Sequence, residues 1–115
     1  MRRPSPIDVA VEVIADTSPV VLPIWIRGVT GAVCGDLGYR YKVMTSGAGH
    51  DAQIVNSIAS AGMILVPSRD GLSHVPEEWT STSDVARGVD VLRTSVVRLD
   101  ALLGSLEAIP AAAAD

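Results

Sequence analysis

Aromatic residues, histidines and cysteines are scarce in this sequence of 115 residues. Phenylalanine is absent and aromatic residues make up only 3% of the chain, which argues against the stacking surfaces that bind single-stranded nucleic acid. The net charge of -4 also differs from the basic surfaces that bind phosphate backbones, so no nucleic-acid partner is expected. One cysteine excludes an internal disulfide, and two histidines cannot supply a histidine-rich metal site.

Long uninterrupted hydrophobic runs are missing as well, although hydrophobic residues make up 48% of the chain. The most apolar stretch, residues 19–26, contains two prolines and is too short to span a bilayer. Prolines and an aspartate follow the basic residues at the start, where an export signal needs an apolar core. The sequence therefore predicts a cytoplasmic protein without a membrane segment, built around one hydrophobic core at most.

The hydrophobic pattern predicts an α/β fold. Polar and apolar residues alternate over residues 7–13. A strand at 39–44 and a continuous apolar run at 62–66 are predicted on either side of a helical pattern that includes Ile54, Val55 and Ile58. These elements form a βαβ unit, in which parallel strands are joined by a helix. The loops at 45–50 and 67–78 are then expected at the same edge of the sheet.

Two more helices are predicted on either side of this unit. Apolar spacing predicts a helix over 24–37, with Gly38 as its stop. A long amphipathic helix begins at 80–84 and is expected to end at Gly104. The chain divides into a strand and linker at 1–22, a main part at 23–107, and an Ala-rich tail at 108–115 predicted to be disordered.

The two predicted edge loops carry the chemistry. The first consists of Ser46, Gly47, Ala48, Gly49, His50 and Asp51, and it places backbone N–H groups beside an imidazole and a carboxylate. Such a loop favours an anion or oxyanion, but the same glycines also suit a tight turn in which Asp51 caps the helix.

In the second loop, His74 is followed by Glu77 and Glu78. His74 suits a metal ligand, with Glu77 or Glu78 orienting its ring from outside the ligand set. A purely structural histidine is the alternative at this position.

A dinucleotide-binding unit is a third interpretation of the first loop. Residues 47–52 match the G-x-G-x-x-A fingerprint, and Asp70 follows at about the distance of a ribose-binding acid. Against this, two residues separate the strand from the first glycine, and Asp70-Gly71 is typical of a turn.

Three segments together resemble a known enzyme family. They are residues 44–53 (MTSGAGHDAQ), 62–68 (GMILVPS) and 71–80 (GLSHVPEEWT), followed by the closing helix. In this order they resemble the C-terminal end of the hydantoinase/carbamoylase-type amidases, which include N-carbamoyl-L-amino-acid hydrolases, β-ureidopropionases and allantoate amidohydrolases. The resemblance implies that residues 23–107 are the C-terminal part of a catalytic domain of the zinc-metallopeptidase type, and that residues 1–22 are the end of a lid-domain strand and a linker.

The resemblance also implies a site. In that family two zinc or manganese ions activate a water that breaks a C–N bond of a carbamoyl or amide substrate. His74 matches a metal ligand, while Ser46, Gly47, Gly49, His50 and Asp51 match the substrate side. Glu77 and Glu78 match motif positions beside the ligand. The family's other ligands precede this segment, so no catalytic residue is assigned within this chain.

We therefore expect a fragment that is inactive alone and that binds no metal by itself. A complementing chain with the remaining ligands would make it half of a split enzyme acting on a small carbamoyl or amide substrate. The alternatives are an inactive remnant or an interaction module, which would form a homo-oligomer through exposed apolar surface.

Overall fold

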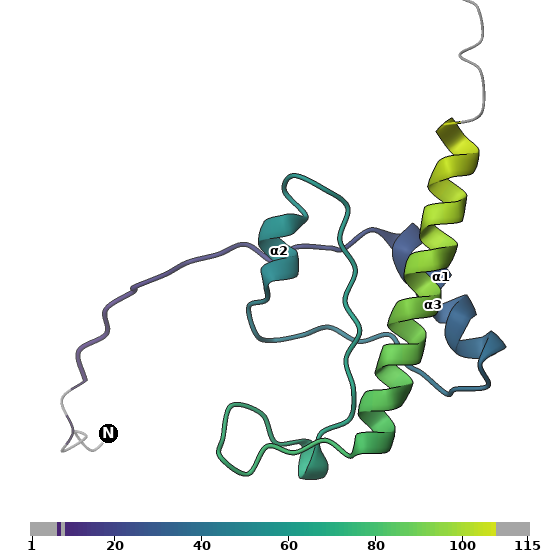
Figure 1. Ribbon diagram of the computed structural model, residues 1–115. Helices are drawn as coiled ribbons and strands as arrows, with labels where there is room; N and C mark the ends of the chain where they lie inside the picture. Colours follow the sequence, from purple (N-terminus) through teal and green to yellow (C-terminus); the bar gives the residue numbers. More distant parts are fainter. Residues whose placement is uncertain (1–6, 8, 108–115) are drawn as a thin grey trace, which may run out of the picture.

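The computed structural model describes residues 7 and 9–107, and its scaffold is a pair of helices (Figure 1). The elements in chain order are α1 (Ile24–Asp36), α2 (Asp51–Val55), a short 3-10 helix η1 (Arg69–Gly71) and α3 (Thr82–Glu107). Helices α1 and α3 pack against each other. The segments between them run as long loops beside this pair, and the predicted tail at 108–115 lies outside the described residues.

Helix α1 ends where the sequence predicts. Gly38 has a positive φ of 72°, a conformation that glycine adopts without steric cost. Its N–H donates to the carbonyl of Gly35 at 3.0 Å, and the next N–H, of Tyr39, donates to that of Cys34 at 2.8 Å. These two bonds form a Schellman motif, which satisfies carbonyl groups that the helix end would leave unpaired.

Helix α3 begins at a side-chain cap and extends further than predicted. The hydroxyl of Ser81 accepts a hydrogen bond from the N–H of Asp84 at 3.1 Å, the expected N-cap geometry. The prediction that Gly104 ends the helix is wrong, because α3 continues to Glu107. A glycine ends a helix by adopting a left-handed conformation, and Gly104 does not adopt one.

The contact between α1 and α3 holds the small core. Val33, Cys34 and Val91 are buried together, with Tyr39 and Ile64 packed against them. Val33 is fully buried, at 0% exposure. At the end of α1, Asp36 forms an ion pair of 2.8 Å with Arg98 of α3. The core therefore depends on the last turns of α1 and the middle of α3.

The structure does not show the predicted βαβ unit, since no strand is assigned within residues 7 and 9–107. The segments at 39–44 and 62–66 are without regular structure, as is the described part of the predicted strand at 7–13. Alternating side chains define which face a strand buries, but a strand also needs a partner for its backbone N–H and C=O groups. Val9, Val11 and Val13 accordingly remain exposed.

The predicted sheet edge is missing for the same reason. The loops at 45–50 and 67–78 were expected side by side at one edge, but Figure 1 shows the loop after η1 apart from the start of α2. No hydrogen bond or ion pair between described residues joins them.

None of the helices in the described part has the length and apolar character to cross a membrane.

Candidate functional site

The loop of residues 46–51 is organised around His50. The hydroxyl oxygen of Ser46 lies 2.7 Å from Nε2 of His50 and also accepts the N–H of Ala48 at 3.2 Å. His50 is the N-cap of α2, with an extended backbone at φ -138°. Its N–H donates to the side-chain oxygen of Gln53 at 3.2 Å, and the N–H of Gln53 donates to the carbonyl of His50 at 2.9 Å. Both the imidazole and the main chain of His50 are therefore held locally.

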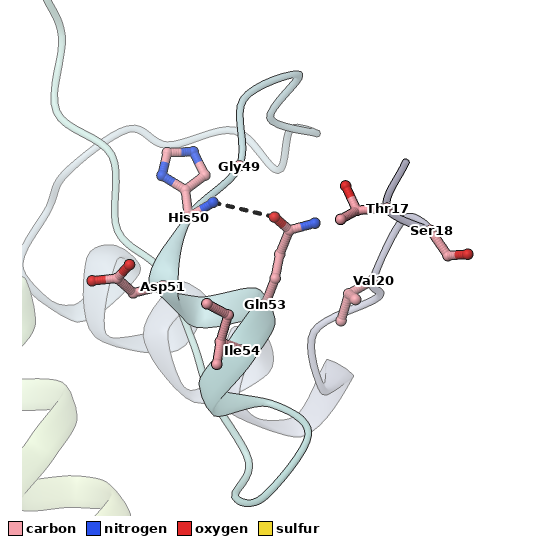
Figure 2. Close-up of a pocket in the computed structure, with 8 residues that line it drawn as sticks. All are labelled: Thr17, Ser18, Val20, Gly49, His50, Asp51, Gln53 and Ile54. Atoms are coloured by element: carbon pink, nitrogen blue, oxygen red, sulfur yellow. Dashed lines mark hydrogen bonds between the residues drawn. The ribbon is translucent and has the colours of Figure 1, made fainter. Parts of the chain in front are cut away.

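An open cleft of about 510 Å³ lies beside this loop. Gly49, His50, Asp51, Gln53 and Ile54 form one wall, and Thr17, Ser18 and Val20 form the other. Figure 2 shows the side chain of Gln53 pointing toward Thr17, whereas the carboxylate of Asp51 points away from that segment. Three of the five predicted substrate residues, Gly49, His50 and Asp51, thus line the cleft. Ser46 does not line it but contacts the ring of His50, and Gly47 does not line it either.

Two features of this cleft were not predicted from the sequence. Its second wall comes from residues 17–20, which the sequence identified only as a loop. The role of Gln53 had a signal, because a Gln or Glu three residues after an N-cap is typical of a capping box. No sequence signal connects Thr17 or Ser18 to a cleft, because their proximity to α2 depends on the path of the chain.

The loop of residues 68–79 is closed at its base by its own ends. The N–H of Arg69 donates to the carbonyl of Trp79 at 2.8 Å, and the Arg69 guanidinium lies 5.1 Å from the centre of the Trp79 ring. The second distance is within the range of a cation–π interaction. Inside the loop, Asp70 and Gly71 adopt positive φ angles of 57° and 69°, which reverse the chain. The loop is therefore a self-contained turn structure.

His74 lies within this closed loop in a strained conformation. Its φ is 62°, in the left-handed region that residues other than glycine seldom occupy. Its N–H donates to a carboxylate oxygen of Glu78 at 2.7 Å, and its Nδ1 lies 2.7 Å from the hydroxyl oxygen of Ser73. No described residue forms a hydrogen bond with Nε2. The His74 side chain is exposed, so this nitrogen is accessible.

The two glutamates predicted to orient the His74 ring differ in what they contact. Glu78 holds the main chain of His74, and Ser73 contacts the ring. Glu77 forms no hydrogen bond or ion pair with any described residue. The ring orientation by Glu77 or Glu78 stays a prediction, because the observed Glu78 contact is to the main chain and the observed ring contact comes from Ser73.

The sequence predicts His74 as one metal ligand, but the described residues do not form a complete metal centre. Histidine is a common metal ligand when one ring nitrogen is hydrogen-bonded and the other has a lone pair, and Nδ1 of His74 lies within hydrogen-bond distance of the Ser73 hydroxyl. Among residues 7 and 9–107, no three His, Cys, Asp or Glu side chains are grouped so that they could hold a metal ion.

The structure also lacks the features that a dinucleotide site needs. That fingerprint places its glycines between a strand and a full helix, whose N-terminus binds the pyrophosphate. No strand precedes Gly47 in the described chain, and α2 has only five residues. The glycines of loop 46–51 therefore do not form this motif.

Comparison with known proteins agrees with the metallohydrolase resemblance. Residues 7–98 match the family model described as Peptidase family M20/M25/M40. The match includes α1, both loops and most of α3. This chain therefore belongs to Peptidase family M20/M25/M40. No solved structure gives a significant match to it.

Several curated relatives are amidohydrolases. The chain is 40% identical over 84 residues to an N-carbamoyl-L-amino-acid amidohydrolase of Paenarthrobacter aurescens, covering 72% of this chain and 20% of that protein. It is 36% identical over 93 residues to an allantoate amidohydrolase of Escherichia coli, covering 81% of this chain and 23% of that protein. An uncharacterized hydrolase of Haemophilus influenzae is 35% identical over 89 residues, or 77% of this chain and 22% of that protein. The chain thus spans about a fifth of the length of these relatives.

Proposed function

We propose that this chain forms part of the catalytic domain of a metal-dependent amidohydrolase, which hydrolyses C–N bonds of N-carbamoyl amino acids or related ureido and amide compounds. The observation that carries the proposal is the family match over residues 7–98, together with relatives named for these reactions. Because the chain spans about a fifth of those relatives, the activity belongs to a larger assembly than the residues present here.

In this assembly His74 provides one metal ligand through Nε2. The zinc or manganese ion would polarise the substrate carbonyl and activate water. Loop 46–51 forms the substrate side, where Gly49 and His50 line the cleft and Ser46 holds the imidazole of His50. Asp51 belongs to the same wall, although its carboxylate points away from residues 17–20.

The remaining metal ligands come from polypeptide outside the described residues. His74 alone cannot retain a catalytic metal, because no second and third donor group lies with it in the described chain. We therefore expect the 115-residue chain to show no hydrolase activity by itself.

Complementation tests this proposal. The full chain is mixed with an allantoate or N-carbamoyl-L-amino-acid amidohydrolase from which the matching fifth has been deleted. Hydrolysis and bound metal are then measured for each component and for the mixture. We expect metal-dependent hydrolysis only in the mixture, with His74→Ala abolishing it and Glu77→Ala leaving it intact. Metal-dependent hydrolysis by the chain alone, or full activity of the His74→Ala mixture, would contradict the proposal.

Self-association is a second candidate, favoured by the apolar face of α3. Val85, Val89, Leu92 and Val96 lie along this helix and remain about half exposed. Large exposed apolar surfaces are typical of interaction sites. An interaction module would form a stable oligomer without metal, which light scattering of the purified chain would detect. A monomer across the accessible concentration range would exclude this candidate.

A further inference from the structure

The protonation of His74 decides whether its accessible nitrogen can act as a ligand. A neutral imidazole carries one proton, so one nitrogen donates and the other offers a lone pair. If the Ser73 hydroxyl donates to Nδ1, the ring proton is on Nε2, which then has no lone pair available. If Nδ1–H donates to the hydroxyl oxygen, Nε2 has the lone pair. The 2.7 Å contact between Ser73 and His74 is compatible with either arrangement.

The carboxylate of Glu78 favours the second arrangement. Its oxygen lies 2.7 Å from the backbone nitrogen of His74. Nδ1 is the ring nitrogen nearer to the main chain, whereas Nε2 is at the far side of the ring. Negative charge beside the main chain therefore stabilises a proton on Nδ1 more than one on Nε2.

The same contact fixes the conformation of the main chain. A left-handed backbone is sterically unfavourable for a residue other than glycine, so His74 needs a compensating interaction. The hydrogen bond from its N–H to the charged Glu78 carboxylate supplies one, since charge-assisted hydrogen bonds are stronger than neutral ones. Glu78 is itself positioned by a turn in which its N–H donates to the carbonyl of Val75 at 3.0 Å.

We propose that Ser73 and Glu78 are positioning residues, which hold His74 as the tautomer protonated on Nδ1 and thereby present the lone pair of Nε2. Ser73 accepts the Nδ1 proton, and Glu78 fixes the backbone and favours that proton electrostatically. The proposal rests on the proposed function only in one respect, namely that the ligand of Nε2 is a metal ion. The tautomer and the backbone conformation are properties of this chain by itself.

NMR of the ¹⁵N-labelled full chain without metal tests the tautomer. At about pH 8.5, where a histidine side chain is ordinarily neutral, long-range proton–nitrogen spectra distinguish the protonated ring nitrogen from the unprotonated one. We expect His74 to be protonated on Nδ1. Ser73→Ala should shift the population severalfold toward the Nε2-protonated form, and Ser73→Thr should restore it. Ser46→Ala, which removes the partner of His50, should leave His74 unchanged.

Glu78 is tested with a charge-matched control. Glu78→Ala should remove both the Nδ1 preference and the strong intraresidue contact between N–H and Hα that marks a positive φ at His74. Glu78→Gln keeps an acceptor oxygen, so the positive φ should persist while the Nδ1 preference weakens. Glu77→Gln removes the same charge without touching His74 and should change neither property.

The outcomes separate this proposal from the proposed function. A wild-type His74 protonated on Nε2, or a tautomer that Ser73→Ala leaves unchanged, would overturn the positioning roles even if the complemented enzyme binds metal through His74. Conversely, an Nδ1-protonated His74 in a chain that no complementation makes active would support the positioning roles and contradict the proposed function.

Discussion

The two histidine loops use the same pair of residue types to present opposite ring nitrogens. In each, a serine oxygen lies 2.7 Å from a histidine, but Ser46 contacts Nε2 of His50, whereas Ser73 contacts Nδ1 of His74. The backbones differ accordingly, with φ at -138° for His50 and 62° for His74. The two Ser–His contacts thus leave different ring nitrogens without a hydrogen bond to a described residue.

The loops also differ in what holds them. Loop 46–51 depends on the first turn of α2, where Gln53 caps the helix. Loop 68–79 depends on its own base, where Arg69 meets Trp79. Both are thus expected to open locally, without unfolding of the α1–α3 core.

The largest expected effect comes from removing core packing, which tests whether the two loops open independently of the α1–α3 core. Val33→Ala should lower the free energy of unfolding by about 2–3 kcal/mol, because Val33 is fully buried between α1 and α3. Hydrogen exchange should accelerate for core helix amides and stay unchanged for both loops. Faster exchange in either loop would show that the loop depends on the core.

A glycine at each histidine should have opposite effects on the two loops. His74→Gly removes the steric strain of the left-handed backbone and should stabilise loop 68–79 by about 1 kcal/mol. His50→Gly should destabilise loop 46–51 by roughly 0.5–1 kcal/mol, because an extended backbone gains nothing from glycine. Opening free energies from hydrogen exchange measure both changes, and equal signs would refute the backbone difference.

A smaller effect is expected from the helix cap. Gln53→Ala removes the acceptor of the His50 N–H, and one exposed hydrogen bond of this kind contributes about 0.5 kcal/mol. Exchange at loop 46–51 should accelerate, while loop 68–79 serves as the internal control. Gln53→Glu retains an acceptor oxygen and should preserve the wild-type rates.

The smallest effect follows from pH and concerns only the core. Burial raises the pKa of the Cys34 thiol above its ordinary value of 9.0. The folded state therefore favours the neutral thiol, and this contribution to stability is present below pH 9.0 and is lost as the pH rises through the folded value. Urea unfolding near neutral and alkaline pH should show this loss, and Cys34→Ala should abolish it. A pH dependence unchanged in Cys34→Ala would contradict the assignment.

Sequence patterns predicted the features that depend on nearby residues. Gly38 marked the end of α1 because the cap needs only a few residues of one helix. The family resemblance was confirmed because its motifs are short and ordered along the chain. Helix α3 continues past Gly104, because a glycine does not end a helix when its own backbone stays helical.

Features that depend on distant partners were not predictable in this way. The patterns at 39–44 and 62–66 predicted strands, but a sequence pattern does not contain the partner that a strand needs. The expected contact between the loops of His50 and His74 required that sheet. The Ser73–His74 contact was local but also escaped prediction, since sequence does not show which ring nitrogen a neighbouring hydroxyl meets.

The closed base of loop 68–79 has a consequence for protein engineering. Ser73, His74 and Glu78 all lie between Arg69 and Trp79, whose contact brings the two ends of the segment together. Joining those ends in a cyclic peptide would therefore impose a restraint that the folded loop already satisfies. The contacts that set the His74 geometry therefore all lie within one short closed segment.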